Sequence, residues 1–94
     1  MKELESYVIE MLVEVYAELY KYGITKEISN RAKVVYNEFI PADTLLSHVV
    51  MSAILQLFAI AYPGSDPDAK VPSQDRIEKI IKDLKEYKQN LEIG

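Results

Sequence analysis

The sequence predicts an all-α fold, a compact four-helix bundle with a central hydrophobic third helix. Three observations predict it: apolar residues recur at three- and four-residue steps, no segment alternates like a strand, and glycine and proline gather between the periodic segments. The chain has 94 residues, of which 49% are hydrophobic and 28% are charged. This size and composition are typical of one folded domain. We therefore expect residues 1–94 to form a single helical domain.

The first two helices are expected over residues 3–22 and 26–39. Gly23 can close the first helix in the left-handed conformation, and Thr25 can cap the second. Apolar residues cover more than half the circumference of the first helix, which is more than one neighbouring helix can cover. We expect this helix to be either wedged among several others or shared with a second subunit. The second helix has an ordinary amphipathic pattern.

The third and fourth helices are expected over residues 42–62 and 74–91. Pro41 favours a sharp corner before the third helix, and Ser73 can cap the fourth, whose apolar residues form one seam. The third helix is apolar nearly all round, which predicts a central position. It is just long enough to cross a bilayer, but its polar interruptions and acidic flanks argue against a membrane span.

Composition argues against several classes of function. The chain has no cysteine, so disulfides, thiolate metal sites and cysteine nucleophiles are excluded, and its single histidine cannot build a two-histidine metal site. Fifteen acidic residues against eleven basic ones give a net charge of -4, which repels a phosphate backbone. We therefore expect a noncatalytic protein that uses no cofactor or metal and does not bind nucleic acid.

Polar residues draw a line along the most apolar helix, at four-residue intervals: Thr44, His48, Ser52 and Gln56. We expect this line to lie in the core. There it can recognise a ligand, satisfy neighbouring hydrogen-bonding groups, or fix the register of a symmetric helix contact. The second interpretation, a structural role, is the preferred one.

Two further features lie on the first helix. A stripe of glutamates can face solvent, pair with the lysines of the second helix, or meet a basic partner, and a solvated face is preferred. The stripe consists of Glu3, Glu10, Glu14 and Glu18. Four of the seven tyrosines also belong to this helix. Tyrosine is enriched at interfaces but is also an ordinary half-buried core residue. The candidate interface residues are Leu12, Tyr16 and Tyr20.

The opening residues lack the pattern of a secretory signal, which predicts a cytoplasmic protein. Glutamate, lysine, isoleucine and tyrosine are plentiful while asparagine and glutamine are scarce. This bias is seen in proteins from hot environments.

Part of the chain resembles a cyclin-like repeat of the transcription factor B type. The similarity to the second helix of that repeat is carried by Ile24-Thr25-Lys26-Glu27-Ile28, Arg31-Ala32-Lys33 and Tyr36-Asn37-Glu38. Fainter similarities are Ser52-Ala53-Ile54-Leu55 with Ala59, and Val71-Pro72. The resemblance covers residues 24–77 and implies a regulatory factor that binds a protein on DNA. The chain departs from the family by its single uninterrupted last helix and by lacking paired repeats and a basic surface, so no functional residue is carried across.

The leading hypothesis is a noncatalytic protein–protein interaction module that forms a homodimer through the apolar face of its first helix or binds another protein. One alternative is a cyclin-like regulatory factor associated with transcription components. Another is a small helical protein like the bacteriocin immunity proteins, which it resembles in size and helix count. A third class is an enzyme or ligand carrier built on His48, Ser52 and Gln56.

Overall fold

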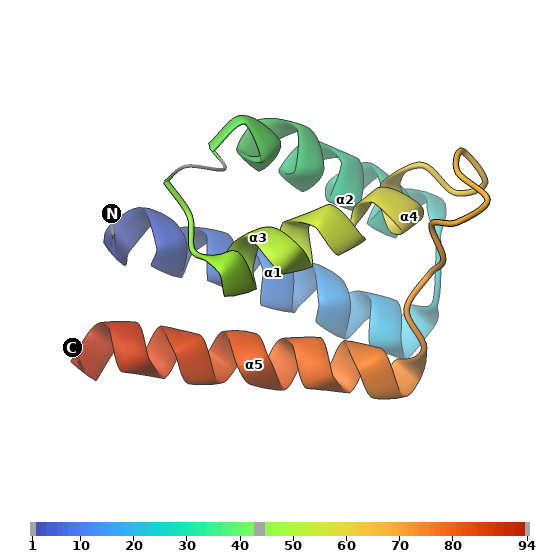
Figure 1. The fold of residues 1–94 in the computed structure, drawn as a ribbon. Helices are drawn as coiled ribbons and strands as arrows, with labels where there is room; N and C mark the ends of the chain where they lie inside the picture. Colours follow the sequence, from blue (N-terminus) through green and yellow to red (C-terminus); the bar gives the residue numbers. More distant parts are fainter. Residues whose placement is uncertain (1, 43–44, 94) are drawn as a thin grey trace.

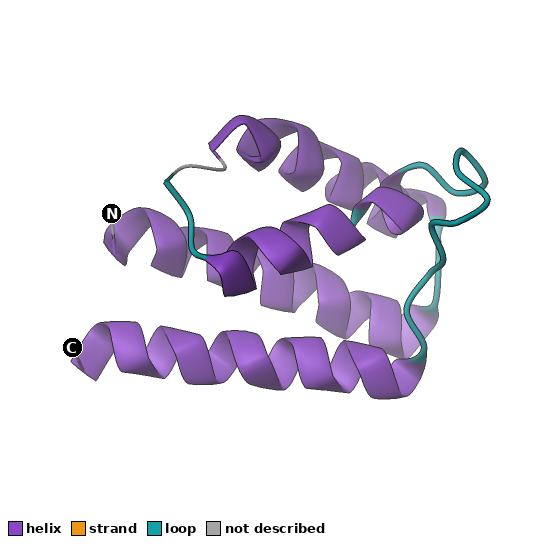
Figure 2. Cartoon of the chain, viewed as in Figure 1, coloured by secondary structure: helices purple, strands orange, loops and turns teal. Residues whose placement is uncertain are grey.

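The computed structural model describes residues 2–42 and 45–93 and contains no strand in these ranges, which confirms the all-α class (Figures 1 and 2). Its elements are α1 (Lys2–Tyr22), α2 (Lys26–Phe39), the 3-10 turn η1 (Ile40–Ala42), α3 (His48–Gln56), α4 (Phe58–Ala61) and α5 (Gln74–Ile93). The short α4 follows α3 directly, so the residues that the structure describes form four helical rods. The molecule measures 39 × 26 × 22 Å.

Local signals fix the ends of the first two helices as the sequence predicts. Gly23 has a φ of 72°, and its N–H donates to the carbonyl of Leu19 at 2.9 Å, which closes α1. The Thr25 hydroxyl accepts a hydrogen bond of 3.1 Å from the N–H of Ile28 and caps α2. Ser73 likewise accepts from the N–H of Arg76 at 3.3 Å where α5 begins.

The third rod differs from the single helix expected over residues 42–62. Pro41 lies in η1, which continues directly from α2, and α3 begins only at His48. Ser47 has an extended backbone, and its hydroxyl accepts from the N–H of Val50 at 3.5 Å, so this residue sets the start. A turn at Leu57 then separates α3 from α4.

The break at Leu57 has a cause in the packing of α1. In an unbroken helix the N–H of Leu57 would donate to the carbonyl of Ala53, but it donates to that of Ile54 at 3.0 Å. The carbonyl of Ala53 instead accepts a hydrogen bond of 2.6 Å from the buried hydroxyl of Tyr16. A side chain that enters the hydrogen-bond ladder is a recognised cause of helix interruption.

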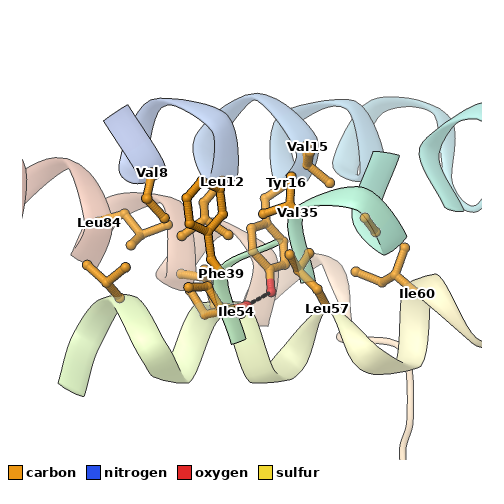
Figure 3. Close-up of a cluster of buried hydrophobic side chains, with 14 of the residues drawn as sticks. Val8, Leu12, Val15, Tyr16, Val35, Phe39, Ile54, Leu57, Ile60 and Leu84 are labelled. Carbon is orange, nitrogen blue, oxygen red and sulfur yellow. Dashed lines mark hydrogen bonds between the residues drawn. The ribbon is translucent and has the colours of Figure 1, made fainter. Parts of the chain in front are cut away.

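The core lies between all four rods (Figure 3). Its largest fully buried side chains come mainly from α1 and from the third rod: Val8, Ile9, Leu12, Val15, Tyr16, Val50, Ile54, Leu57, Ile60 and Leu84. The helices α2, α3 and α5 of the same chain all pack on α1, and α5 runs beside it along most of its length (Figure 1). Of the two expectations for the wide apolar face of α1, a position wedged among neighbours is therefore the one observed.

The third rod packs against α1, α2 and α5, as a central helix must. It is not covered all round, because His48, Val49, Ser52 and Leu55 are exposed on its outer side. Within the described residues, no helix combines the length and the apolar character that a membrane crossing requires.

Candidate interaction surfaces

Two of the three candidate interface residues on α1 lie inside the molecule. Leu12 and Tyr16 are fully buried in the chain's own core, so neither can meet a partner, and the prediction that they form an interface was wrong. The physical reason is the cover that α2, α3 and α5 provide. Burial of the hydroxyl raises the pKa of Tyr16 well above its ordinary value, and the positive charge of Arg76 offsets part of this effect.

The third candidate, Tyr20, remains at the surface with 37% of its area exposed. Its hydroxyl donates a hydrogen bond of 2.7 Å to Oε1 of Glu78, which links α1 to α5. This hydrogen bond to a carboxylate raises the pKa of Tyr20. The polar end of Tyr20 is therefore already engaged within the chain.

The described part of the polar line is not in the core, contrary to the prediction. His48 and Ser52 are exposed and Gln56 is half-buried, whereas Thr44 lies outside the described residues. Residues four positions apart share one face of a helix, and this face of α3 points away from the buried Val50 and Ile54. The polar residues mark the solvent side of an amphipathic helix.

These polar residues line a surface groove along α3, which we call the α3 groove. It has a volume of about 780 Å³ and is lined by Ile40, His48, Met51, Ser52, Leu55, Gln56 and Arg76. Nε of Arg76 donates to Oε1 of Gln56 at 3.3 Å, so a residue of α5 joins the polar line. The sequence analysis did not point to Arg76, because this residue comes close to α3 only when the chain folds.

A second groove lies between α1 and α2, and we call it the α1–α2 groove. Its volume is about 340 Å³, and it is lined by Tyr7, Met11, Glu14, Val15, Asn30, Arg31, Val34 and Val35. Tyr7 and Val34 are 56% and 59% exposed, although both are large apolar residues. The groove is open to solvent and mostly apolar at its base.

The glutamate stripe is partly neutralised within the chain. Arg31 of α2 pairs with Glu14 at 3.0 Å and also with Glu18, and Lys88 of α5 pairs with Glu10 at 2.7 Å. The stripe is therefore more than the solvated face that the sequence analysis preferred. Pairing with the second helix does occur, but through Arg31 and not through the lysines that the sequence analysis expected.

Glu5 is a buried carboxylate that the sequence analysis did not single out. Its Oε2 accepts a hydrogen bond of 3.0 Å from the N–H of Ser47, and the hydroxyl of Tyr87 lies 3.3 Å from the same oxygen. One side chain thus holds together α1, the segment that starts α3, and α5. A signal was present, because Glu5 shares the apolar side of the first helix with Ile9 and Leu12 and lies off the glutamate stripe.

Among the described residues, no group of three or more histidine, aspartate or glutamate side chains is arranged to hold a metal ion. Comparisons with protein-family models, with curated proteins and with solved structures find no significant match to this chain. The similarity of residues 24–77 to a cyclin-like repeat therefore stays a prediction.

Proposed function

We propose that this protein is a noncatalytic interaction module that forms a homodimer through the α1–α2 groove. The observation that carries the proposal is the exposure of Tyr7 and Val34 at the rim of an apolar groove. Large apolar side chains placed together in water favour association, and tyrosine is enriched at interfaces. The single histidine and the absence of cysteine favour the noncatalytic part of the proposal.

The ring of Tyr7 is held in place before any partner arrives. It packs edge-on against Phe39, with 6.4 Å between the ring centroids and 68° between the ring planes. Phe39 itself is buried. An aromatic residue that is already ordered loses little conformational entropy on binding, so it suits the role of an anchor.

A second copy fits this surface because the surface carries its own complement. A two-fold interface joins the same patch on both subunits, so each projection and charge must find its counterpart there. The groove offers a projecting side chain in Tyr7 and a recess over Met11 and Val15. It also places Arg31 next to Glu14, whose charges offset each other within the chain, so this edge of the groove brings no unpaired charge into the contact.

The contact that we propose has to extend beyond Tyr7 and Val34 to reach the size of a stable interface. A stable interface buries about 800 Å² on each partner, roughly one seventh of the surface of 5897 Å² that this chain exposes. We therefore expect neighbouring residues of α1 and α2 to form the polar rim around the groove.

The mass of the protein in solution, measured by light scattering over a concentration range of about a hundredfold, tests the proposal. We expect a dimer whose mass falls to that of a monomer in the variant Val34→Glu, because a charge in the centre of an apolar contact is costly to bury. Val71→Glu is the matched control, since Val71 is 40% exposed but lies in the loop before α5. Circular dichroism verifies that both variants fold.

Three outcomes would contradict the proposal. A wild-type chain that stays monomeric at every concentration removes the homodimer. A dimer that persists in both Val34→Glu and Tyr7→Ser assigns self-association to another face. A dimer lost equally in the Val71→Glu control would show that added charge, rather than the groove, controls association.

A further inference from the structure

The α3 groove differs in chemistry from the α1–α2 groove. Ile40, Met51 and Leu55 give it an apolar part, and Leu55 is 52% exposed. Its remaining lining residues are polar or basic: His48, Ser52, Gln56 and Arg76. Among the residues that the structure describes, no acidic side chain lines this groove, although the chain as a whole has more acidic than basic residues.

The two arginines of the chain have different surroundings. Arg31 is neutralised by Glu14 and Glu18. Arg76 has an amide partner in Gln56, and within the described part of the chain no carboxylate lies within 4 Å of its guanidinium. A guanidinium without an internal carboxylate keeps donors available for a planar anion, which it can bind through two parallel hydrogen bonds.

The neighbouring polar residues orient this guanidinium. Nε2 of Gln56 donates to the backbone oxygen of Ser52 at 3.4 Å, and the same nitrogen lies 3.5 Å from the Ser52 hydroxyl. The oxygen of the Gln56 amide then accepts from Nε of Arg76. Because Nε is already bound, the two terminal nitrogens of Arg76 are the ones left for a ligand. Gln56 is a positioning residue in this arrangement.

We propose that the α3 groove binds a small amphipathic carboxylate, whose anionic head pairs with Arg76 and whose apolar chain covers Met51 and Leu55. A positive group beside an apolar surface complements a ligand that carries both an anion and a hydrocarbon chain. The groove volume of about 780 Å³ lies within the range of about 300 to 1,000 Å³ that is usual for small-molecule sites. This site shares no lining residue with the α1–α2 groove, so it is independent of the proposed dimer.

Nuclear magnetic resonance of the labelled full chain, titrated with octanoate at neutral pH, tests the proposal. We expect saturable shifts of the amides from His48 to Gln56 and at Arg76. Acetate lacks the apolar chain and 1-octanol lacks the charge, so each should bind about tenfold more weakly or worse. Arg76→Gln should weaken octanoate by a similar factor, because it removes the ion pair.

Lys70→Gln is the control for charge, since it removes one exposed positive charge from the loop before α5 and should bind like the wild type. Leu55→Ser tests the apolar part and should weaken octanoate but not acetate. Unchanged binding in Arg76→Gln, equal binding of octanol, equal binding of acetate, or no saturable shift would each overturn the proposal. Shifts at residues 48–56 that follow protein concentration without ligand would assign the groove to a second copy and overturn it as well.

Discussion

The hydroxyl of Tyr16 donates a hydrogen bond of 2.6 Å to the backbone oxygen of Ala53, at the point where the third rod breaks (Figure 3). In an unbroken helix this carbonyl would accept a hydrogen bond from the N–H of Leu57, which donates to the carbonyl of Ile54 instead. The bond thus satisfies two buried polar groups at once, a hydroxyl in the core and a carbonyl that has lost its helical partner. Tyr16, which the sequence placed at an interface, is an internal link between α1 and α3.

Replacement of Tyr16 by phenylalanine should lower the free energy of unfolding by about 1 to 3 kcal/mol, because the Ala53 carbonyl stays buried without a partner. Urea denaturation measures the change. Tyr22→Phe is the matched control, since Tyr22 is 62% exposed, and its effect should stay within about 0.5 kcal/mol. Equal stability of wild type and Tyr16→Phe would show that this hydrogen bond contributes nothing net.

The same residue predicts a loss of stability in alkali. The pKa of Tyr16 is raised in the folded chain by burial, so the folded state holds this proton at pH values where an unfolded tyrosine, with a pKa of about 10, has released it. The contribution of protonated Tyr16 to the free energy of unfolding is fully present below about pH 10. It is lost as the pH rises above this value, by at most about 1.4 kcal/mol per pH unit. Urea midpoints at several pH values between neutrality and strong alkali should therefore fall less steeply in Tyr16→Phe than in wild type. Parallel slopes in the two proteins would contradict this assignment.

The helix ends that the sequence predicts depend on local chemistry. Gly23 closes α1, Thr25 caps α2 and Ser73 caps α5 through contacts with residues a few positions away. The spacing of apolar residues predicts that each of these elements is a helix and not a strand. For these reasons the expected ranges 3–22, 26–39 and 74–91 agree closely with α1, α2 and α5.

The features that the sequence did not predict depend on partners distant in the chain. Tyr16 interrupts the third rod from 37 positions away in the sequence, and Arg76 donates a hydrogen bond to Gln56, which is 20 positions away. The polar line was predicted in the core for another reason, namely the high apolar content of residues 45–62. The four-residue spacing of His48, Ser52 and Gln56 by itself indicates a single exposed face of the helix.

Glu5 should contribute to stability through the N–H of Ser47. Replacement of Glu5 by alanine removes a buried acceptor, so the N–H of Ser47 and the hydroxyl of Tyr87 lose their hydrogen-bond partner. We therefore expect the free energy of unfolding to fall by about 1 to 3 kcal/mol. Glu3→Ala is the control, because Glu3 is exposed two positions earlier on the same helix. Hydrogen exchange provides a second readout: the start of α3 should lose protection in Glu5→Ala more than the middle of α1 does. A uniform loss of protection would indicate that Glu5 does not act on that segment in particular.

Leu55 and Leu57 provide a direct test of which side of the third rod faces the core. They are two positions apart, yet Leu55 is 52% exposed and Leu57 is fully buried. Leu57→Ala removes packed atoms and leaves a cavity, which should cost about 2 to 5 kcal/mol. Leu55→Ala removes the same atoms from the surface and should change the free energy of unfolding by no more than about 0.5 kcal/mol. Similar large losses in both variants would mean that this helix is covered all round, as its apolar composition first suggests, and would leave no room for a groove along its outer face.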